Sequence, residues 1–282
     1  MSTLTAERSL TAQVTELVDA GKVKLPLLPQ VVLKAQQLLA TDRASAGALA
    51  ALLEQDPAMT MALIRLANSA TFGGLGRVDS LNGAIQRIGL SQVGALITGL
   101  GVKAQFAHPD AARAKVLHVL WTHSITTAFA AKAIAKKIGV NPERAFLAGL
   151  LHDCGKVLVL SALDALIRQR VVRAVTPEAT RDVIVALHAM LGHRMLTQWA
   201  LPADVASAAL LHHEPAGAGQ DLLLCVQAAN LITRRLGFHP EPDPTMTVVG
   251  DPVITELGLT DVQVATMMVD LEIHLEEMQR LF

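Results

Sequence analysis

The chain has little of what builds β-sheets. Its 282 residues contain no tyrosine, only 3% are aromatic, and β-branched residues seldom alternate with polar ones. Strands favour β-branched and aromatic side chains, so this composition argues against a β-rich fold. Alanine and leucine, both strong helix formers, are abundant, and hydrophobic residues make up 51% of the chain. We therefore predict an all-α fold with a substantial buried core.

Cysteine is equally scarce. Cys154 and Cys225 lie in apolar segments without zinc-ribbon spacing, which fits reduced, buried thiols better than a disulfide framework. The N-terminal segment lacks the basic start, apolar middle and small-residue cleavage site of a secretory signal. We expect a cytoplasmic protein.

Long apolar runs and charge of one sign are missing too. Polar residues at 152, 153, 156 and 164 interrupt the longest apolar stretches, well before the roughly 20 apolar residues that a membrane span needs. The net charge is −1, and the densest positive segments, AAKAIAKK (130–137) and RQRVVR (168–173), are typical of solvated helix faces. We predict no transmembrane helix, no membrane partner and no nucleic-acid partner.

Capping residues and first-turn prolines precede several apolar-periodic runs. They predict helices that begin after Asp56-Pro57, Ser80, Ser91, Asn141-Pro142 and Pro202. Turns are predicted at 25–30, 72–77 and 214–221, with a proline-rich connection at 239–244. In ANSATFG (67–73), Asn68 and Ser69 either close a helix by hydrogen bonds or bind a ligand.

A break near 107–113 separates an N-terminal half from a C-terminal half that holds most of the histidines. We predict an N-terminal helix over 1–24, a helical subdomain over 25–107, a second over 108–236, and a C-terminal helical extension over 237–282. The last helix is amphipathic and packs either on its own core or on a second protomer, which leaves a homodimer open.

The segment LAGLLHDCGKVLVL (147–160) places a histidine and a carboxylate inside what reads as a buried helix. Burying a carboxylate is costly unless it is paired, hydrogen-bonded or bound to metal. His152 and Asp153 are therefore either a structural hydrogen-bonded pair or part of a metal site. Lys156 either extends its amine to solvent or contacts a phosphate. Gly155 is consistent with a close approach of two helices.

Further histidines lie on other predicted helices, each on a different one: His123, His188 and the pair His212-His213. A single histidine on an apolar face is unremarkable, whereas five or six converging from four helices suit iron, manganese or zinc. His193 lies about 140° around the helix from His188, so it is not expected to be a ligand. The remaining histidines have no clustered partners and are read as surface or core residues: His108, His118, His239 and His274.

The order of these histidines resembles the HD superfamily of metal-dependent phosphohydrolases, and the ligand set is similar to that of the HD-GYP branch, which hydrolyses cyclic di-GMP. Other segments resemble, in order, the HDOD family, the HD-related output domain of bacterial signalling. They are LPLLPQVVLKAQQLLATD, LAALLEQDPAMTMALIRLANSATFG, SLNGAIQRIGLSQVGALI, LWTHSITTAFAAKAIAKKIG, AFLAGLLHDCGKVLV and LLCVQAANLI. The resemblance spans about 25–236.

This resemblance implies an all-helical fold in which an N-terminal helical subdomain packs on an HD-like core. It also implies a regulatory role, because no general catalytic activity is established for HDOD proteins. Lys156 matches the lysine of the family's HDxGK element. The implied metal ligands are His123, His152, Asp153, His188, His212 and His213.

The sequence departs from the HD-GYP pattern in three places. Val119 stands where a glutamate ligand is found, Asn230 lies near the position of a late aspartate, and EPAGAGQD (214–221) lacks the Gly-Tyr-Pro signature. Two of these changes remove anionic ligands. The four-ligand set that remains comprises Asp153, His188, His212 and His213. The expectation is one divalent metal rather than two, and no organic cofactor.

We interpret the chain as a cytoplasmic bacterial signal-transduction module, non-catalytic or weakly catalytic, that binds an unidentified partner protein or a nucleotide signal. The alternative is a metal-dependent phosphohydrolase acting on a nucleotide or cyclic dinucleotide. In that case Asp153 and Lys156 would be the catalytic residues, with the metal lowering the pKa of a bound water.

Overall fold

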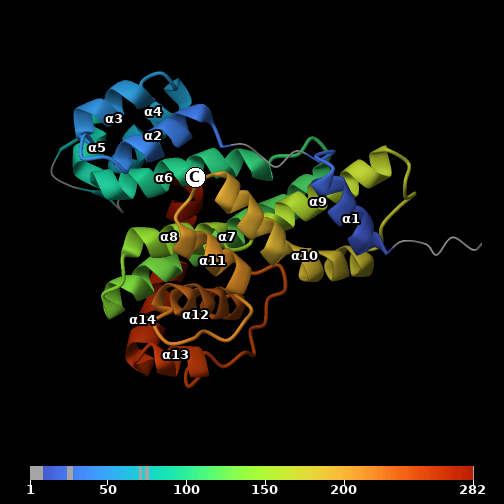
Figure 1. Ribbon diagram of the computed structural model, residues 1–282. Coiled ribbons are helices and arrows are strands. Elements are labelled where there is room, and N and C mark those ends of the chain that lie inside the picture. Colours follow the sequence, from blue (N-terminus) through green and yellow to red (C-terminus); the bar gives the residue numbers. More distant parts are fainter. Residues whose placement is uncertain (1–8, 24–27, 70–71, 74–75, 282) are drawn as a thin grey trace, which may run out of the picture. The chain divides into compact units, whose positions relative to one another are not determined.

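The computed structural model describes residues 9–23, 28–69, 72–73 and 76–281, with side chains described as far as 273 (Figure 1). Over these residues the chain forms helices joined by loops and contains no strand, which confirms the predicted all-α class. Parts of three predicted features lie outside the described residues: the start of the helix over 1–24 and portions of the turns at 25–30 and 72–77. The side chain of His274 lies outside them as well.

The chain separates into two compact units, each built from two stretches of sequence. The histidine unit comprises 1–27 and 151–213, and the large unit comprises 28–150 and 214–282. The subdomain boundaries expected from the sequence, near 107 and 236, stay predictions.

The histidine unit is organised around its longest helix. Its helices are α1 (Leu10–Asp19), α9 (Cys154–Arg168), α10 (Pro177–Gln198) and α11 (Ala203–Leu211). Helix α10 packs against α9 and α11, and α1 packs against α9 and α10. Their apolar faces form one core that includes Val14, Leu158, Leu163, Leu187 and Leu191. Because α10 contacts both neighbours, a side chain on its inner face can meet residues from α9 and α11.

The large unit contains the other helices. They are α2 (Gln30–Leu39), α3 (Ala46–Leu53), α4 (Pro57–Ala67), α5 (Leu81–Ile88), α6 (Leu90–Lys103), the short η2 (Ala104–Phe106), α7 (Ala111–Ile138), α8 (Pro142–Leu151), α12 (Asp221–Arg235), α13 (Pro252–Glu256) and α14 (Asp261–Leu281). The long α7 packs against α12 and α14. Val264 and Met267 of α14 are buried in the same core as Ile134 and Ile232. The C-terminal amphipathic helix therefore packs on its own chain, while a homodimer stays a prediction.

Most of the predicted helix starts are confirmed. Asp56 caps α4 by accepting a hydrogen bond from Met59 N at 3.0 Å, and Ser80 Oγ accepts one from Gly83 N at 3.2 Å. Asn141 Oδ1 accepts from Glu143 N at 3.0 Å at the start of α8, and α11 begins directly after the predicted proline. These side chains satisfy amide groups that have no partner inside the helix.

The start predicted at Ser91 is wrong. Helix α6 begins at Leu90, and Ser91 lies within its first turn. The preceding residue, Gly89, has φ 91°, and its backbone both ends α5 and begins α6. Glycine adopts this conformation without the steric cost that other residues incur, so the chain turns there without a side-chain cap.

Asn68 and Ser69 close α4 by hydrogen bonds, as the helix-ending interpretation predicts. Asn68 Nδ2 donates to Ile64 O at 2.9 Å and to Val78 O at 2.7 Å, and Asn68 Oδ1 accepts from Val78 N at 2.9 Å. Ser69 Oγ donates to Leu66 O at 2.7 Å. The asparagine thereby also holds the far end of the loop that follows α4.

Both cysteines and the longest apolar stretch of the sequence belong to the buried core. Cys154 and Cys225 are free and buried, and burial raises the pKa of the Cys225 thiol to about 12. Among the described residues, one stretch, Pro142–Arg168, is long and apolar enough to cross a membrane by composition alone. Because 89% of its most apolar window is buried inside the protein, its composition is accounted for by the core.

Candidate metal centre

The segment expected to form one buried helix is interrupted at its polar pair. Helix α8 ends at Leu151 and α9 begins at Cys154, so His152 and Asp153 lie in a turn. Asp153 occupies the N-cap position of α9 with φ −103° and ψ 6°, yet its side chain makes no capping bond. The expectation of a continuous helix is therefore wrong at this point. The turn leaves the carboxylate available for side-chain partners.

The Asp153 carboxylate is buried among cationic and imidazole groups. Its Oδ2 lies 2.6 Å from Lys156 Nζ and 3.3 Å from His152 Nε2. Its Oδ1 lies 3.5 Å from His212 Nε2 and 3.6 Å from His188 Nε2. Each oxygen of this one buried carboxylate thus faces at least two nitrogen atoms.

Lys156 does not extend to solvent. Its side chain is 12% exposed, and its ammonium donates to Asp153 one turn earlier in sequence. A charge-assisted bond of this length is among the stronger side-chain interactions in proteins. The solvent-directed interpretation is therefore wrong, and the amine offsets the buried negative charge.

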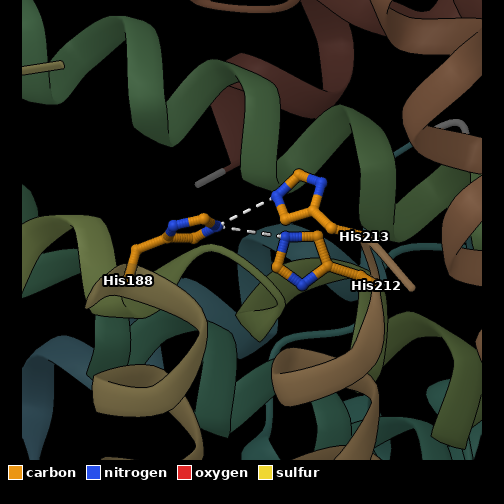
Figure 2. Close-up of side chains that lie close together, drawn as sticks. All are labelled: His188, His212 and His213. Carbon is orange, nitrogen blue, oxygen red and sulfur yellow. Dashed lines mark hydrogen bonds between the residues drawn. The ribbon is translucent and has the colours of Figure 1, made fainter. Parts of the chain in front are cut away.

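Three histidine rings lie close to one another, and two of them are the rings that face Asp153 (Figure 2). His188 Nε2 lies 3.1 Å from His213 Nε2 and 3.3 Å from His212 Nε2. His188 comes from α10, whereas His212 and His213 follow the end of α11. His188 and His212 are buried and His213 is exposed, so the group of rings is reached by solvent on the side of His213.

Backbone carbonyl groups fix which nitrogen of each buried ring carries the proton. His188 Nδ1 lies 2.6 Å from Ile184 O, and His212 Nδ1 lies 2.9 Å from Ala209 O. A carbonyl oxygen only accepts, so both Nδ1 atoms donate and the neutral rings present unprotonated Nε2 atoms. Burial lowers the pKa of His188 to about 4, and burial also lowers the pKa of His212. At neutral pH, therefore, two acceptor nitrogens face each other and a carboxylate oxygen.

These donor atoms fit a divalent metal ion. A metal–nitrogen bond of about 2.1 Å gives ligand-to-ligand edges of about 3.0 Å in an octahedron and about 3.4 Å in a tetrahedron. The four separations given above, from His188 Nε2 to each of the other three atoms and from His212 Nε2 to Asp153 Oδ1, run from 3.1 to 3.6 Å. A cation would accept all four lone pairs and remove the repulsion between the two unprotonated rings. The cluster can therefore bind a metal ion.

Two glycines bring the helices that carry these ligands together. A Cβ atom on Gly155 of α9 would meet the backbone of α10, 2.6 Å from Gly192 N and in contact with the carbonyl of His188. The predicted close approach is thus confirmed. Glycine at this position lets α9 and α10 approach closely enough for His188 to meet Asp153.

His123 is the one predicted ligand that belongs to the large unit. Its Nδ1 lies 2.9 Å from Phe238 O and 3.4 Å from Thr127 Oγ1, whose hydroxyl is 3.3 Å from Thr233 Oγ1. The ring of His239 stands edge-on against it at 4.7 Å between centroids. His239 was read from the sequence as having no clustered partner, and that interpretation is wrong.

The other predicted ligands all lie in the histidine unit, where side-chain contacts connect His152, Asp153, His188, His212 and His213. His193 points elsewhere, with Nδ1 3.0 Å from Ala206 O, as its position on the helix predicts. Sequence reasoning missed the two carbonyl groups that orient the rings. These carbonyl groups lie four residues before His188 and three before His212. That helical spacing is the sequence signal that could have identified them.

Two solved structures share the fold described above. A protein from Shewanella amazonensis SB2B, provisionally named a metal-dependent phosphohydrolase, aligns with a TM-score of 0.76 at 20% identity over 95% of this chain and 97% of its own. An HDOD domain protein with unknown function from Geobacter sulfurreducens aligns with a TM-score of 0.72 at 22% identity over 96% and 98%. At these identities the likeness shows the shared fold.

An uncharacterized protein of Treponema pallidum (strain Nichols) is 28% identical over 242 residues, which are 82% of this chain and 46% of that protein. The chain therefore spans less than half the length of this relative. The HDOD domain family matches residues 25–215, more than half of the sequence. The chain belongs to the HDOD family.

Proposed function

We propose that the chain is a regulatory HDOD module of bacterial signalling that binds one divalent metal ion and acts by binding a partner protein or a nucleotide. The metal ligands are Asp153, His188, His212 and His213. The observation that carries the proposal is the meeting of three imidazole Nε2 atoms, two of which also face one oxygen of a buried carboxylate, with the two buried rings held in the tautomer that ligates.

The donor set favours binding over turnover. Imidazole and carboxylate together suit iron, manganese or zinc, and such an ion supplies a Lewis acid that can polarise a phosphate oxygen. Hydrolysis by the two-metal route needs a second ion, and anionic ligands are the usual means of holding it. The cluster contains one carboxylate, and that carboxylate is already paired with Lys156. Val119, at the position of a family glutamate, is exposed and cannot replace it.

A phosphohydrolase activity is the second candidate, because solvent reaches the cluster beside His213. In that case Asp153 would hold the metal ion, and Lys156 would supply positive charge near a bound phosphate.

We also propose that the protein is located in the cytoplasm. Its two buried free thiols support this location, because a reducing compartment keeps cysteines unpaired.

The first experiment measures metal content by elemental analysis of untagged protein purified without chelator. We expect close to one iron, manganese or zinc ion per chain in the wild type and a loss of most of it in His212→Ala. His193→Ala is the matched control, because His193 belongs to the same unit but bonds to Ala206 O outside the cluster. Wild-type protein that folds but retains no metal under any loading condition would contradict the proposal.

A second experiment separates binding from hydrolysis. Wild type, Asp153→Asn and the control Asp182→Asn, an exposed carboxylate on α10, are loaded with manganese and assayed against bis-p-nitrophenyl phosphate and cyclic di-GMP. The regulatory proposal predicts no turnover that depends on Asp153. Turnover that is abolished in Asp153→Asn and retained in Asp182→Asn would establish the phosphohydrolase instead.

A further inference from the structure

The large unit contains a cavity of about 450 Å³ between α5, α6, α7 and α14. This volume falls within the range of about 300–1,000 Å³ that is usual for small-molecule sites. None of the six predicted metal ligands lines it. The cavity therefore needs an explanation separate from the metal centre.

Helical spacing concentrates basic side chains on one wall of this cavity. Phe129, Lys132 and Lys136 of α7 all line it, and their spacing of three and four residues places them on the same face of the helix. The sequence had suggested that these lysines belong to a solvated face. Lys132 is instead only 14% exposed, with Nζ 3.5 Å from Glu143 Oε1, so its charge is largely withdrawn from water.

Arg87 of α5 adds a rigid donor group. Its Nη1 donates to Ala67 O at 3.2 Å and its Nη2 donates to Gly76 O at 2.8 Å. These bonds use two of the five N–H groups of the guanidinium and hold the plane of the group in place. The other N–H groups can meet an anion without the entropy cost of first ordering the side chain.

The surrounding charge is mainly positive. Arg87 also lines a second cavity of about 550 Å³, together with Arg65 and Arg77. Among the described residues, five basic side chains line one or both of the two cavities, and Asp270 is the one acidic residue that lines either. Such a concentration of arginine and lysine attracts phosphate groups.

The wall beside the cations is apolar. It includes Phe129, Met267 and Leu271, and the ring of Phe129 is held edge-on by Phe146 at 5.3 Å between centroids. An aromatic ring and a methionine offer a surface on which a flat base can lie. Phosphate-binding cations next to such a surface match the two chemical parts of a nucleotide.

We propose that this cavity is a nucleotide-binding site, with the phosphates at Arg87, Lys132 and Lys136 and the base against Phe129 and Met267. The site is distinct from the histidine cluster. It identifies where the nucleotide of the proposed function binds, but it depends on the large unit alone and does not require that the cluster hold a metal ion.

The test is isothermal titration calorimetry of the full chain, stripped of metal, with ATP, GTP and inorganic triphosphate as separate probes. Lys136→Glu and Lys137→Glu form a matched pair, because both lysines are exposed in the last turn of α7 but only Lys136 lines the cavity. We expect at least one nucleotide to bind more tightly than triphosphate. Lys136→Glu should weaken its binding by about tenfold or more, and Lys137→Glu by less than about twofold.

His212→Ala, which disrupts the metal cluster, should bind the nucleotide as the wild type does. The proposal is wrong if no nucleotide binds, if the two lysine variants weaken binding equally, or if triphosphate alone binds as tightly as the nucleotides. Loss of nucleotide binding in a folded His212→Ala variant would also overturn it. Each result is independent of the metal content measured for the wild type, so the two proposals fail separately.

Discussion

In the histidine unit, His188 and His212 donate from Nδ1 to a carbonyl of their own helix and present Nε2 to other rings and to the Asp153 carboxylate. In the large unit, His123 Nδ1 also faces a backbone carbonyl, that of Phe238, but threonine hydroxyls and the edge of another ring surround it. The same tautomer is therefore set in both units. What differs is what each unit itself places around the ring: other rings and a carboxylate in the histidine unit, and a carbonyl, hydroxyl groups and one other ring in the large unit.

This difference suggests how a metal site is recognised without a bound ion. A buried histidine that bonds to a carbonyl is ordinary, because buried polar groups need partners. Two rings with the same fixed tautomer whose Nε2 atoms lie 3.3 Å apart are not ordinary, because two unprotonated nitrogens at that distance repel each other. A cation would remove this repulsion, and the close approach of α9 and α10 lets His188 meet Asp153.

The largest effect is expected from Gly155→Ala, which tests whether that close approach builds the cluster. The added methyl group would meet the backbone of α10, so the two helices must separate. We expect a loss of about 1–3 kcal/mol in the free energy of unfolding and a marked fall in metal content. Chemical denaturation and elemental analysis measure the two quantities.

Gly47→Ala is the control for that substitution. Gly47 lies inside α3, and a Cβ atom there would have no neighbour within 4 Å. The change should leave metal content intact and stabilise the protein by up to about 1 kcal/mol. Equal behaviour of the two variants would show that the contact at Gly155 does not position the ligands.

A second test uses pH on the metal-free protein. Burial lowers the pKa of His188 to about 4, whereas the unfolded chain keeps the ordinary value of about 6.5. Between these values the unfolded state binds more protons, so the free energy of unfolding should fall as the pH drops from about 6.5 to about 4. The contribution of this one residue is about 3 kcal/mol at most.

Urea denaturation of chelated protein at several pH values measures this fall. His188→Gln cannot titrate and should show a shallower dependence, whereas His118→Gln, which replaces an exposed histidine of α7, should follow the wild type. If His188→Gln lost stability on acidification as steeply as the wild type, the buried neutral ring would not be the cause.

The smallest effect is expected in the large unit, where the environment of His123 is held by several bonds. Thr127→Val removes a hydroxyl that contacts His123 and Thr233, but His123 keeps Phe238 O and Thr233 keeps Asn230 O. We expect a loss of about 0.5–1.5 kcal/mol in the free energy of unfolding and no change in metal content.

Thr266→Val, which removes an exposed hydroxyl of α14, serves as the comparison for Thr127→Val and should change stability less. A loss of metal in Thr127→Val would mean that the two histidine environments are coupled.

How much of this could be predicted from the sequence depends on the range of the interaction involved. Caps such as Asp56, Ser80 and Asn141 act within three residues, so local pattern was enough to locate the helices they begin. The turn at 152–153 was missed because the segment is apolar on both sides of it. Two non-helical residues between two apolar helices leave the hydrophobic pattern almost unchanged.

In the candidate site, too, features encoded locally in the sequence could be predicted, and contacts between distant segments could not. The ligand residues were identified as types and positions through a family resemblance, and side-chain contacts in the structure connect five of them within one unit. The bond from Lys156 to Asp153 was missed because both a solvent-directed and an inward amine are compatible with its spacing. The ring of His239 against His123 and the cavity beside Lys136 depend on contacts between helices far apart in sequence, which no local pattern encodes.

X-ray absorption spectroscopy of the metal-loaded protein tests the central claim most directly, because it counts the atoms bound to the ion. The account predicts about three imidazole nitrogens at about 2.0–2.2 Å, with oxygen ligands completing the shell, and a loss of imidazole scattering in His188→Gln. A shell made of oxygen alone, or an unchanged imidazole signal in that variant, would show that the ion binds elsewhere and that the cluster of His188, His212, His213 and Asp153 is not a metal centre.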